Sequence, residues 1–243
     1  MRNLWTIAKR EFNMYFVSPV AYAVAFAFLL VLGLIFANTL AQAVTQGFPP
    51  QPTQILGLFV TLMLFLSPAL TMRLMAEEQR SGTLELLLTA PVREWELVTG
   101  KWLAAFGFIA LLIFTTGLYA FITNAYTTPG IDTGTLLAAY TGLLLMCAAM
   151  LAVGVFVSSL FANQIAAFFA TMAVLLGLWL INLPWQNATG PLAEVMNYLA
   201  LPDHFYNNFY GGAVDLTDAT YFISLAVLFL FLAARTVESR RWR

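Results

Sequence analysis

The chain has 243 residues, of which 61% are hydrophobic and only 9% are charged. Soluble domains contain about 45–50% apolar and about 25% charged residues, so this composition excludes a soluble globular protein. It also excludes a disordered chain, whose signature is low hydrophobicity. The 11 basic and 12 acidic residues give a net charge of −1, and this balance conceals a very uneven distribution of charge along the sequence.

The N-terminal segment, residues 1–18, combines apolar and basic side chains at helical spacing. Leu4, Trp5 and Phe12 are interleaved with the bases Lys9 and Arg10. This pattern predicts an amphipathic helix that lies along the inner membrane surface before the first span. A disordered tail is the alternative, which Trp5 and Phe12 disfavour.

Four runs without a charged residue predict the membrane spans. The runs 12–72 and 133–193 are each long enough for two spans and a turn, because one span needs about 20 mostly apolar residues. Prolines at 49, 50 and 52 stop the helix inside the first run, and polar residues at 158–164 interrupt the second. We therefore expect six transmembrane helices, at 19–40, 54–75, 101–123, 135–158, 164–183 and 219–236.

Nine charged residues gather at 73–101, between the second and third predicted spans. Span 2 is expected to continue as a helix until Gly82 interrupts it. Thr83 can cap a new short helix, Glu85 falls in the first turn, where the helix dipole favours an anion, and Pro91 ends the helix after about two turns. One apolar face is formed by Leu84, Leu87 and Leu88.

A two-turn helix is not stable alone, so its leucine face must be covered. It either lies on the bilayer interface or its own spans, or it docks a cytosolic partner. An apolar helix face flanked by charges suits a groove in another protein.

The longest stretch expected outside the membrane is 184–218. Pro191 suits the first position of a helix, and apolar residues follow at helical spacing. The candidate residues for an outer gate or a contact with a partner are His204, Phe205, Tyr206 and Phe209. Their aromatic surface fits equally an aromatic belt at the membrane interface or a docking surface for a periplasmic partner.

The basic residues predict the orientation of the chain. All 11 fall in 1–18, 76–100 and 237–243 or in the span ends beside the inner segments, whereas 41–53, 124–134 and 184–218 contain no Lys or Arg. With seven acidic residues inside and five outside, the inner side carries 11 − 7 = +4 and the outer side −5. The positive-inside rule then puts both termini in the cytosol, which agrees with six spans.

Several kinds of chemistry are missing from the sequence. The spans contain no Asp, Glu, Lys, Arg or His away from their ends, which argues against a pump driven by a proton gradient, whereas backbone, Asn or Thr oxygens could still bind Na⁺. Gly100-Lys101 is followed by Trp102 rather than Ser or Thr, so no phosphate-binding loop is formed. Nothing pairs with the only histidine, His204, at a recognisable spacing. The single Cys147 excludes a disulfide framework. We expect a chain that is not an enzyme and binds no metal or cofactor itself.

Residues 72–92 contain Glu77-Glu78 followed by Gly82-Thr83-Leu84-Glu85, and Gly100-Lys101 comes soon after. This stretch resembles the cytosolic loop of ABC-2 type transporter permeases. Over nearly the whole chain the sequence looks most like the gliding-motility (GldF-like) ABC permease branch. That narrower resemblance rests on Tyr15–Tyr22, Tyr140–Leu143, Ser158–Leu160, Asn163–Phe168 and His204-Phe205.

The resemblance implies an all-α integral membrane protein with one six-span domain over 1–243. Residues 1–18 would be the amphipathic connecting helix, 76–100 the cytosolic coupling loop and 184–218 an extracytoplasmic segment with re-entrant helices. The implied ATPase-coupling residues are Glu77, Glu78, Arg80, Gly82, Thr83, Leu84, Glu85, Leu87, Leu88 and Pro91.

The resemblance also implies partners and a location. Two copies would form a homodimer in a bacterial inner membrane, each seating one separate ABC ATPase on the 77–91 loop. That ATPase would bind ATP and Mg. A further membrane subunit with a large periplasmic domain is implied, and no nucleic acid. The chain would couple ATP hydrolysis to export or to force transmission; the alternative is a stand-alone channel or gradient-driven carrier. Uncharged spans point to an apolar or weakly polar translocation surface, without identifying the substrate.

Overall fold

The computed structural model describes residues 2–47, 51–82, 93–127 and 130–240, and every regular element within these ranges is a helix. In chain order they are α1 (Arg2–Val17), α2 (Pro19–Gln46), α3 (Thr53–Thr71), α4 (Ala76–Ser81), α6 (Glu94–Tyr126), α7 (Thr133–Leu160), α8 (Gln164–Leu180), α9 (Pro191–Tyr198), α10 (Asp203–Tyr206), the 3₁₀ turn η1 (Phe209–Gly211) and α11 (Leu216–Arg240). The all-helical class expected from the sequence is confirmed for this part of the chain.

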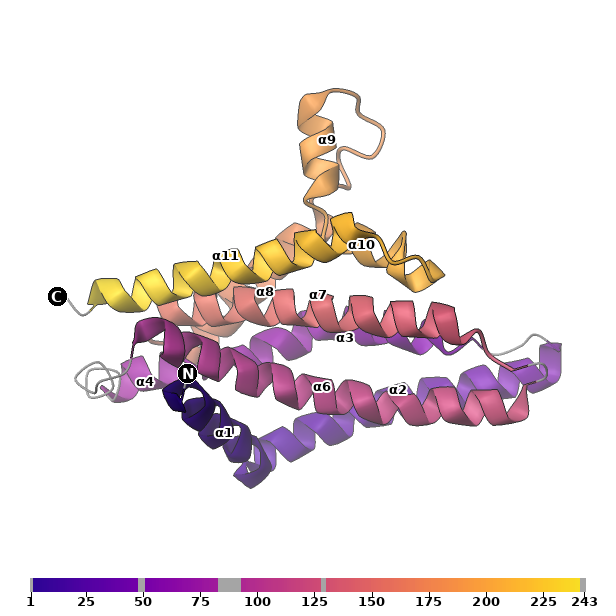
Figure 1. The fold of residues 1–243 in the computed structure, drawn as a ribbon, viewed down its shortest axis with the longest axis horizontal. Helices are drawn as coiled ribbons and strands as arrows, with labels where there is room; N and C mark the ends of the chain where they lie inside the picture. The colour runs from indigo at the N-terminus through magenta and orange to yellow at the C-terminus, as the bar shows by residue number, and fades with distance from the viewer. Residues whose placement is uncertain (1, 48–50, 83–92, 128–129, 241–243) are drawn as a thin grey trace.

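The long helices run along one axis of an elongated bundle (Figure 1). The central helix is α7, which packs against α3, α6, α8 and α11. It is apolar on all sides, as expected for a helix with neighbours all around it. Glycine lets α3 come close to it, because a Cβ on Gly154 would overlap the Thr71 side chain.

Five of these helices are long and apolar enough to cross a membrane: α2, α3 with α4, α6, α7 and α11. The remaining predicted span, 164–183, corresponds to α8, an apolar helix of 17 residues. Several predicted boundaries were wrong by a few residues. The largest difference is at α6, which begins at Glu94 rather than at 101; the Glu96 carboxylate accepts from the Arg93 backbone N–H (3.2 Å) and so caps the first turn.

The second predicted span does not continue as one uninterrupted helix into the charged loop. Instead α3 ends at Thr71, a turn covers 72–75, and α4 begins at Ala76. Pro68 lies in the last turn of α3. Gly82 ends α4 with φ of 70°, a left-handed conformation in which glycine has no steric cost. The interruption predicted at Gly82 is therefore confirmed.

The N-terminal helix meets α2 at a sharp corner. Ser18 has extended backbone angles because it precedes Pro19, and proline disfavours the helical conformation in the residue before it. As Figure 1 shows, α1 and α2 form a V beside α6. One arm of this V, α1, packs along α6, whereas much of α2 faces outward. The placement of α1 on a membrane surface stays a prediction.

After α8 the chain leaves the bundle and returns. Figure 1 shows α9 projecting to one side, and within this helix only Ala193 is buried. The chain then comes back through α10 and η1, which pack against α7, and leads into α11.

Candidate functional site

The predicted coupling residues divide between two parts of the chain. Glu77, Glu78, Arg80 and Gly82 lie on α4 or directly after it. The others, Thr83, Leu84, Glu85, Leu87, Leu88 and Pro91, lie outside the described residues. What the structure shows is therefore how α4, the segment that leads into the leucine-rich stretch, is attached to the bundle.

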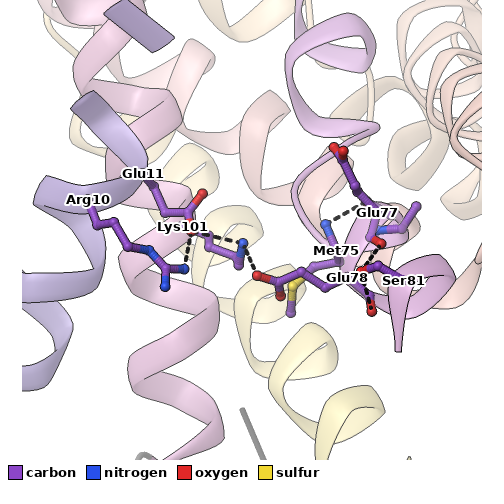
Figure 2. A network of polar contacts seen from close by, with 9 residues as sticks. Arg10, Glu11, Met75, Glu77, Glu78, Ser81 and Lys101 are labelled. Atoms are coloured by element: carbon purple, nitrogen blue, oxygen red, sulfur yellow. Dashed lines mark hydrogen bonds and ion pairs between the residues drawn. The ribbon is translucent and has the colours of Figure 1, made fainter. Parts of the chain in front are cut away.

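A buried lysine connects α4 to two other helices. The Lys101 ammonium of α6 lies 2.8 Å from a carboxylate oxygen of Glu78 on α4 and 3.2 Å from a carboxylate oxygen of Glu11 on α1. Figure 2 shows Lys101 between these two side chains. Only 2% of Lys101 and 4% of Glu11 is exposed. We call these three residues the Lys101 ion cluster.

Such burial constrains the geometry. A charge removed from water must be paired, since its desolvation otherwise costs several kcal/mol. The cluster has one cation and two carboxylates, and Arg10 adds a second cation 2.6 Å from Glu11 while itself remaining half exposed. The four groups together carry no net charge. Separating α4 from α1 and α6 would leave Lys101 or a carboxylate without its partner.

The sequence next to Lys101 explains why the helices meet there. Gly100 precedes it and faces α1: a Cβ at this position would lie 2.9 Å from Cγ2 of Ile7. Ile7 and Glu11 are four residues apart and share one face of α1. Gly100 therefore allows the close approach of α1, and this approach brings Glu11 to Lys101.

A second attachment fastens the start of α4 to the end of α7. The Ser158 hydroxyl oxygen accepts from the backbone N–H groups of Met75 and Ala76, at 3.2 Å each, and lies 3.3 Å from the Met72 carbonyl. The first N–H groups of a helix have no partner within the helix. Ser158 thus caps α4 from another helix.

One turn later, the Gln79 side-chain amide donates to the backbone carbonyl of Ser159 at 2.8 Å. The sequence had marked Ser158 and Ser159 only as the approach to a break between spans. Instead they belong to the last turn of α7, and the break comes after Leu160.

Sequence reasoning missed Glu11, Lys101 and Ser158 as members of the site. Glu11 and Lys101 each border a charge-free run, so both were taken as markers of span ends. A signal was present in the pair Gly100-Lys101: a glycine beside a lone base inside a helix suggests a close helix crossing next to a buried charge.

On the other side of the molecule, the four residues predicted for an outer gate do not form one exposed surface. Phe205 and Phe209 are fully buried, and Phe209 packs so close to α7 that a Cβ on Gly142 would overlap it. The Tyr206 hydroxyl donates to the Gly57 carbonyl of α3 at 2.9 Å. These aromatic side chains fix α10 and η1 to the bundle.

His204 has a charged partner, contrary to the expectation from the sequence. Its Nδ1 lies 2.6 Å from Asp218 on α11, and its Nε2 lies 2.7 Å from the Tyr198 carbonyl. The ring also stacks on Tyr221, with centroids 3.9 Å apart. Asn208 donates to the other carboxylate oxygen of Asp218 at 2.7 Å. We call these five residues the His204 cluster.

Both ring nitrogens of His204 face acceptors. The carboxylate of Asp218 and the carbonyl of Tyr198 therefore fix the orientation of the imidazole ring from its two sides. The sequence did not reveal this pair, because the residues are 14 positions apart on different helices. The contacts described here hold α10 against α11 and include no nucleophile.

A bundle of long apolar helices with its charges gathered at the ends defines a multi-pass membrane protein. A family model described as "ABC-2 family transporter protein" matches residues 5–237, and the chain therefore belongs to that family. It is a membrane permease component of an ABC transporter, and the family implies association with an ABC ATPase subunit. A search of curated proteins finds no match.

Proposed function

We propose that this chain couples ATP hydrolysis on a separate ABC ATPase to export or to force transmission across the membrane. The observation that carries the proposal is the attachment of α4. This helix leads directly into the segment 83–92 and is held by the Lys101 ion cluster and by Ser158.

These contacts give a displacement of α4 a short route into the bundle. Glu78 connects α4 through Lys101 to α6 and α1. Ser158 and Ser159 connect α4 to α7, which contacts α3, α6, α8 and α11. A flexible loop could be displaced by an ATPase without moving the bundle. A helix that is bonded to α7 at its start and along its side transmits the displacement to that central helix.

The rest of the proposal extends this mechanism to the assembly. The leucine face of the segment 83–92 docks the ATPase as a coupling helix, α2, α3, α6, α7, α8 and α11 span the membrane, and both termini are cytosolic. Two copies form a homodimer in a bacterial inner membrane. The proposed relation to the GldF-like branch carries with it an accessory subunit with a large periplasmic domain; support for these finer statements comes from the sequence patterns alone.

Co-purification with the ATPase tests the docking surface. Leu84→Asp combined with Leu87→Asp is expected to abolish both ATPase binding and its stimulation, because two carboxylates cannot enter an apolar groove without a large desolvation cost. Leu84→Met combined with Leu87→Met is the matched control, which keeps the apolar face and is expected to bind. If the aspartate variant still binds and activates the ATPase, the segment is not the coupling helix.

Reconstitution tests the requirement for ATP. Liposomes that contain the permease and its ATPase are expected to show transport or a conformational cycle only with hydrolysable ATP. Transport by the purified chain in liposomes without any ATPase would contradict the proposal and favour a stand-alone channel or carrier.

A further inference from the structure

A cleft of about 480 Å³ opens at the end of the bundle formed by α1, α4 and the first turns of α6. One wall is the corner between α1 and α2, and the other is the end of α3 with the turn that leads to α4. Figure 1 shows the two helices that meet at this corner, α1 and α2, diverging as a V after Pro19.

The wall toward the middle of the bundle is apolar. It is built by Ala21 and Val24 of α2 and by Ala69 and Leu70 of α3. Three of these side chains are small, which leaves width between the helices, and none carries a polar group. This part of the cleft suits a hydrocarbon chain that enters from the bilayer between α2 and α3.

The mouth of the cleft is charged. Three carboxylates, Glu11, Glu77 and Glu78, and two bases, Arg73 and Lys101, line it, a balance of 2 − 3 = −1. Lys101 is already committed to Glu11 and Glu78. Arg73 lies in the turn before α4 and Glu77 in the first turn of α4, both are exposed, and neither makes an ion pair with a residue in the described ranges.

A third polar group at the cleft is also without a partner. Tyr15 lines the cleft, its ring stacks on Phe108 with centroids 4.9 Å apart, and its buried hydroxyl has no hydrogen-bond partner among the described residues. Burial, and then the nearby Glu11 carboxylate, raise the pKa of this phenol, so it keeps its proton. Buried hydroxyls nearly always have a partner; an acceptor at the mouth would supply one.

We propose that the cleft binds a phospholipid whose headgroup carries a primary ammonium group. The phosphate is placed near Arg73 and the Tyr15 hydroxyl, the ammonium group near Glu77, and an acyl chain along the wall of Ala21, Val24 and Ala69. A base, a neutral donor and a carboxylate at one mouth match a headgroup with both a phosphate and an N–H-bearing cation.

This inference deepens the proposed function and rests on its placement of the chain in a membrane. The turn between α3 and α4 forms one wall of the cleft, so an occupant contacts the same segment that carries the proposed coupling. Binding itself does not require an ATPase, and the two proposals can therefore fail separately.

The test uses the full chain purified in detergent and native mass spectrometry with three phospholipids of identical acyl chains. Phosphatidylethanolamine is expected to bind about tenfold more tightly than phosphatidylcholine, whose trimethylammonium group has no N–H to donate, or phosphatidylglycerol, which has no cation. Equal binding of the three lipids would overturn the proposal.

Four variants locate the site. Glu77→Gln is expected to remove the preference for phosphatidylethanolamine, and Arg73→Gln to weaken all three lipids. Both positions are exposed, so folding is preserved. Val24→Trp fills the apolar wall and is also expected to weaken all three. Glu238→Gln, an exposed carboxylate on α11 outside the cleft, is the control. A preference that survives both Glu77→Gln and Val24→Trp would overturn the assignment.

The bound phospholipid can be either a resident membrane lipid or a lipid that the transporter moves. Liposomes containing the permease–ATPase complex separate them, since ATP-dependent appearance of phosphatidylethanolamine in the opposite leaflet marks cargo and stable binding without movement marks a resident lipid. Both outcomes require the binding preference in the purified chain. Loss of ATPase docking with that preference intact would overturn the proposed coupling alone.

Discussion

The Lys101 ion cluster and the His204 cluster each bury a carboxylate against a nitrogen partner, but they connect different kinds of neighbours. Lys101 joins three helices, α1, α4 and α6, and its partner Glu11 is 90 residues away along the chain. His204 joins α10 to α11, and its partner Asp218 is only 14 residues away. The first cluster joins parts of the chain that are far apart in sequence and meet only in the complete bundle. The second cluster joins two helices that follow each other closely in the sequence.

The two clusters also differ in how completely their groups are bonded. Asp218 uses both carboxylate oxygens, His204 uses both ring nitrogens, and Tyr221 stacks on the imidazole. By contrast, the contacts described for α4 are spread along it: the Lys101 ammonium lies on Glu78, the Ser158 hydroxyl accepts at its start, and the Ser159 carbonyl accepts from Gln79. The contacts of α4 involve separate groups and can break one at a time, whereas those of α10 share His204 and Asp218, so α10 can move only if several bonds break together. This difference fits α4 as a moving element and α10 as a fixed one.

The largest effect is expected from Lys101→Met. It leaves Glu11 and Glu78 buried without their shared cation, and loss of one partner of a buried pair costs about 3–5 kcal/mol of the free energy of unfolding. Thermal unfolding in detergent measures it, and ATPase stimulation is expected to disappear as well. Combining Lys101→Met with Glu11→Gln and Glu78→Gln removes the stranded charges and should recover most of the stability. A single variant as stable as the wild type would show that the cluster does not hold the helices.

Asp218→Ala is expected to have a somewhat smaller effect and to lower the free energy of unfolding by about 3 kcal/mol. The loss is smaller because the segment that joins α10 to α11 keeps its ring stacking and its backbone contacts. The comparison predicts a difference in kind: ATPase binding should remain, since the His204 cluster is distant from α4. His204→Gln, whose side-chain amide can still donate a hydrogen bond to Asp218, should be milder. Loss of ATPase binding in Asp218→Ala, at a temperature where the chain is folded, would contradict the prediction that only the Lys101 ion cluster affects the ATPase.

The two clusters also mark what the sequence could reveal. Apolar periodicity and charge-free runs located the long helices, and the corner before Pro19 and the stop at Gly82 follow from local backbone preferences. The pairing of Glu11 with Lys101 depends on which helix faces meet, and no local pattern contains that information. For the same reason Phe205 and Phe209 were taken as surface residues. An aromatic run is equally compatible with a membrane interface and with a core until its neighbours, here Gly142 of α7, are known.

Ser158→Ala distinguishes the contribution of the α4–α7 contact to stability from its contribution to ATPase stimulation. It removes the hydroxyl that caps α4 and is expected to cost about 1–2 kcal/mol, the usual value for a lost helix cap. Its effect on ATPase stimulation should be larger than this stability loss suggests, because the first residues of α4 then lose the hydrogen bonds that fasten them to α7. Ser159→Ala is the matched control: its hydroxyl bonds within α7 to the Phe156 carbonyl, and its own backbone carbonyl still accepts from Gln79. Equal stimulation in the two variants would contradict the proposed role of Ser158.

The smallest effect tests whether the close approach of α1 to α6 sets up the Lys101 ion cluster. Gly→Ala in the middle of a helix normally stabilises by up to about 1 kcal/mol. Gly117→Ala on α6 should do so, since nothing lies within 4 Å of the added Cβ. Gly100→Ala should instead destabilise by about 1 kcal/mol, because the new Cβ pushes Ile7 away and draws Glu11 from Lys101. Adding Ile7→Ala removes the nearest atom, Cγ2, but leaves the Cβ of residue 7 and the Leu4 carbonyl at 3.1 Å, so it should relieve only part of the crowding. If Gly100→Ala and Gly117→Ala are equally stabilising in thermal unfolding, α1 is not held against α6 at Gly100, and the ion cluster is formed by the long side chains alone.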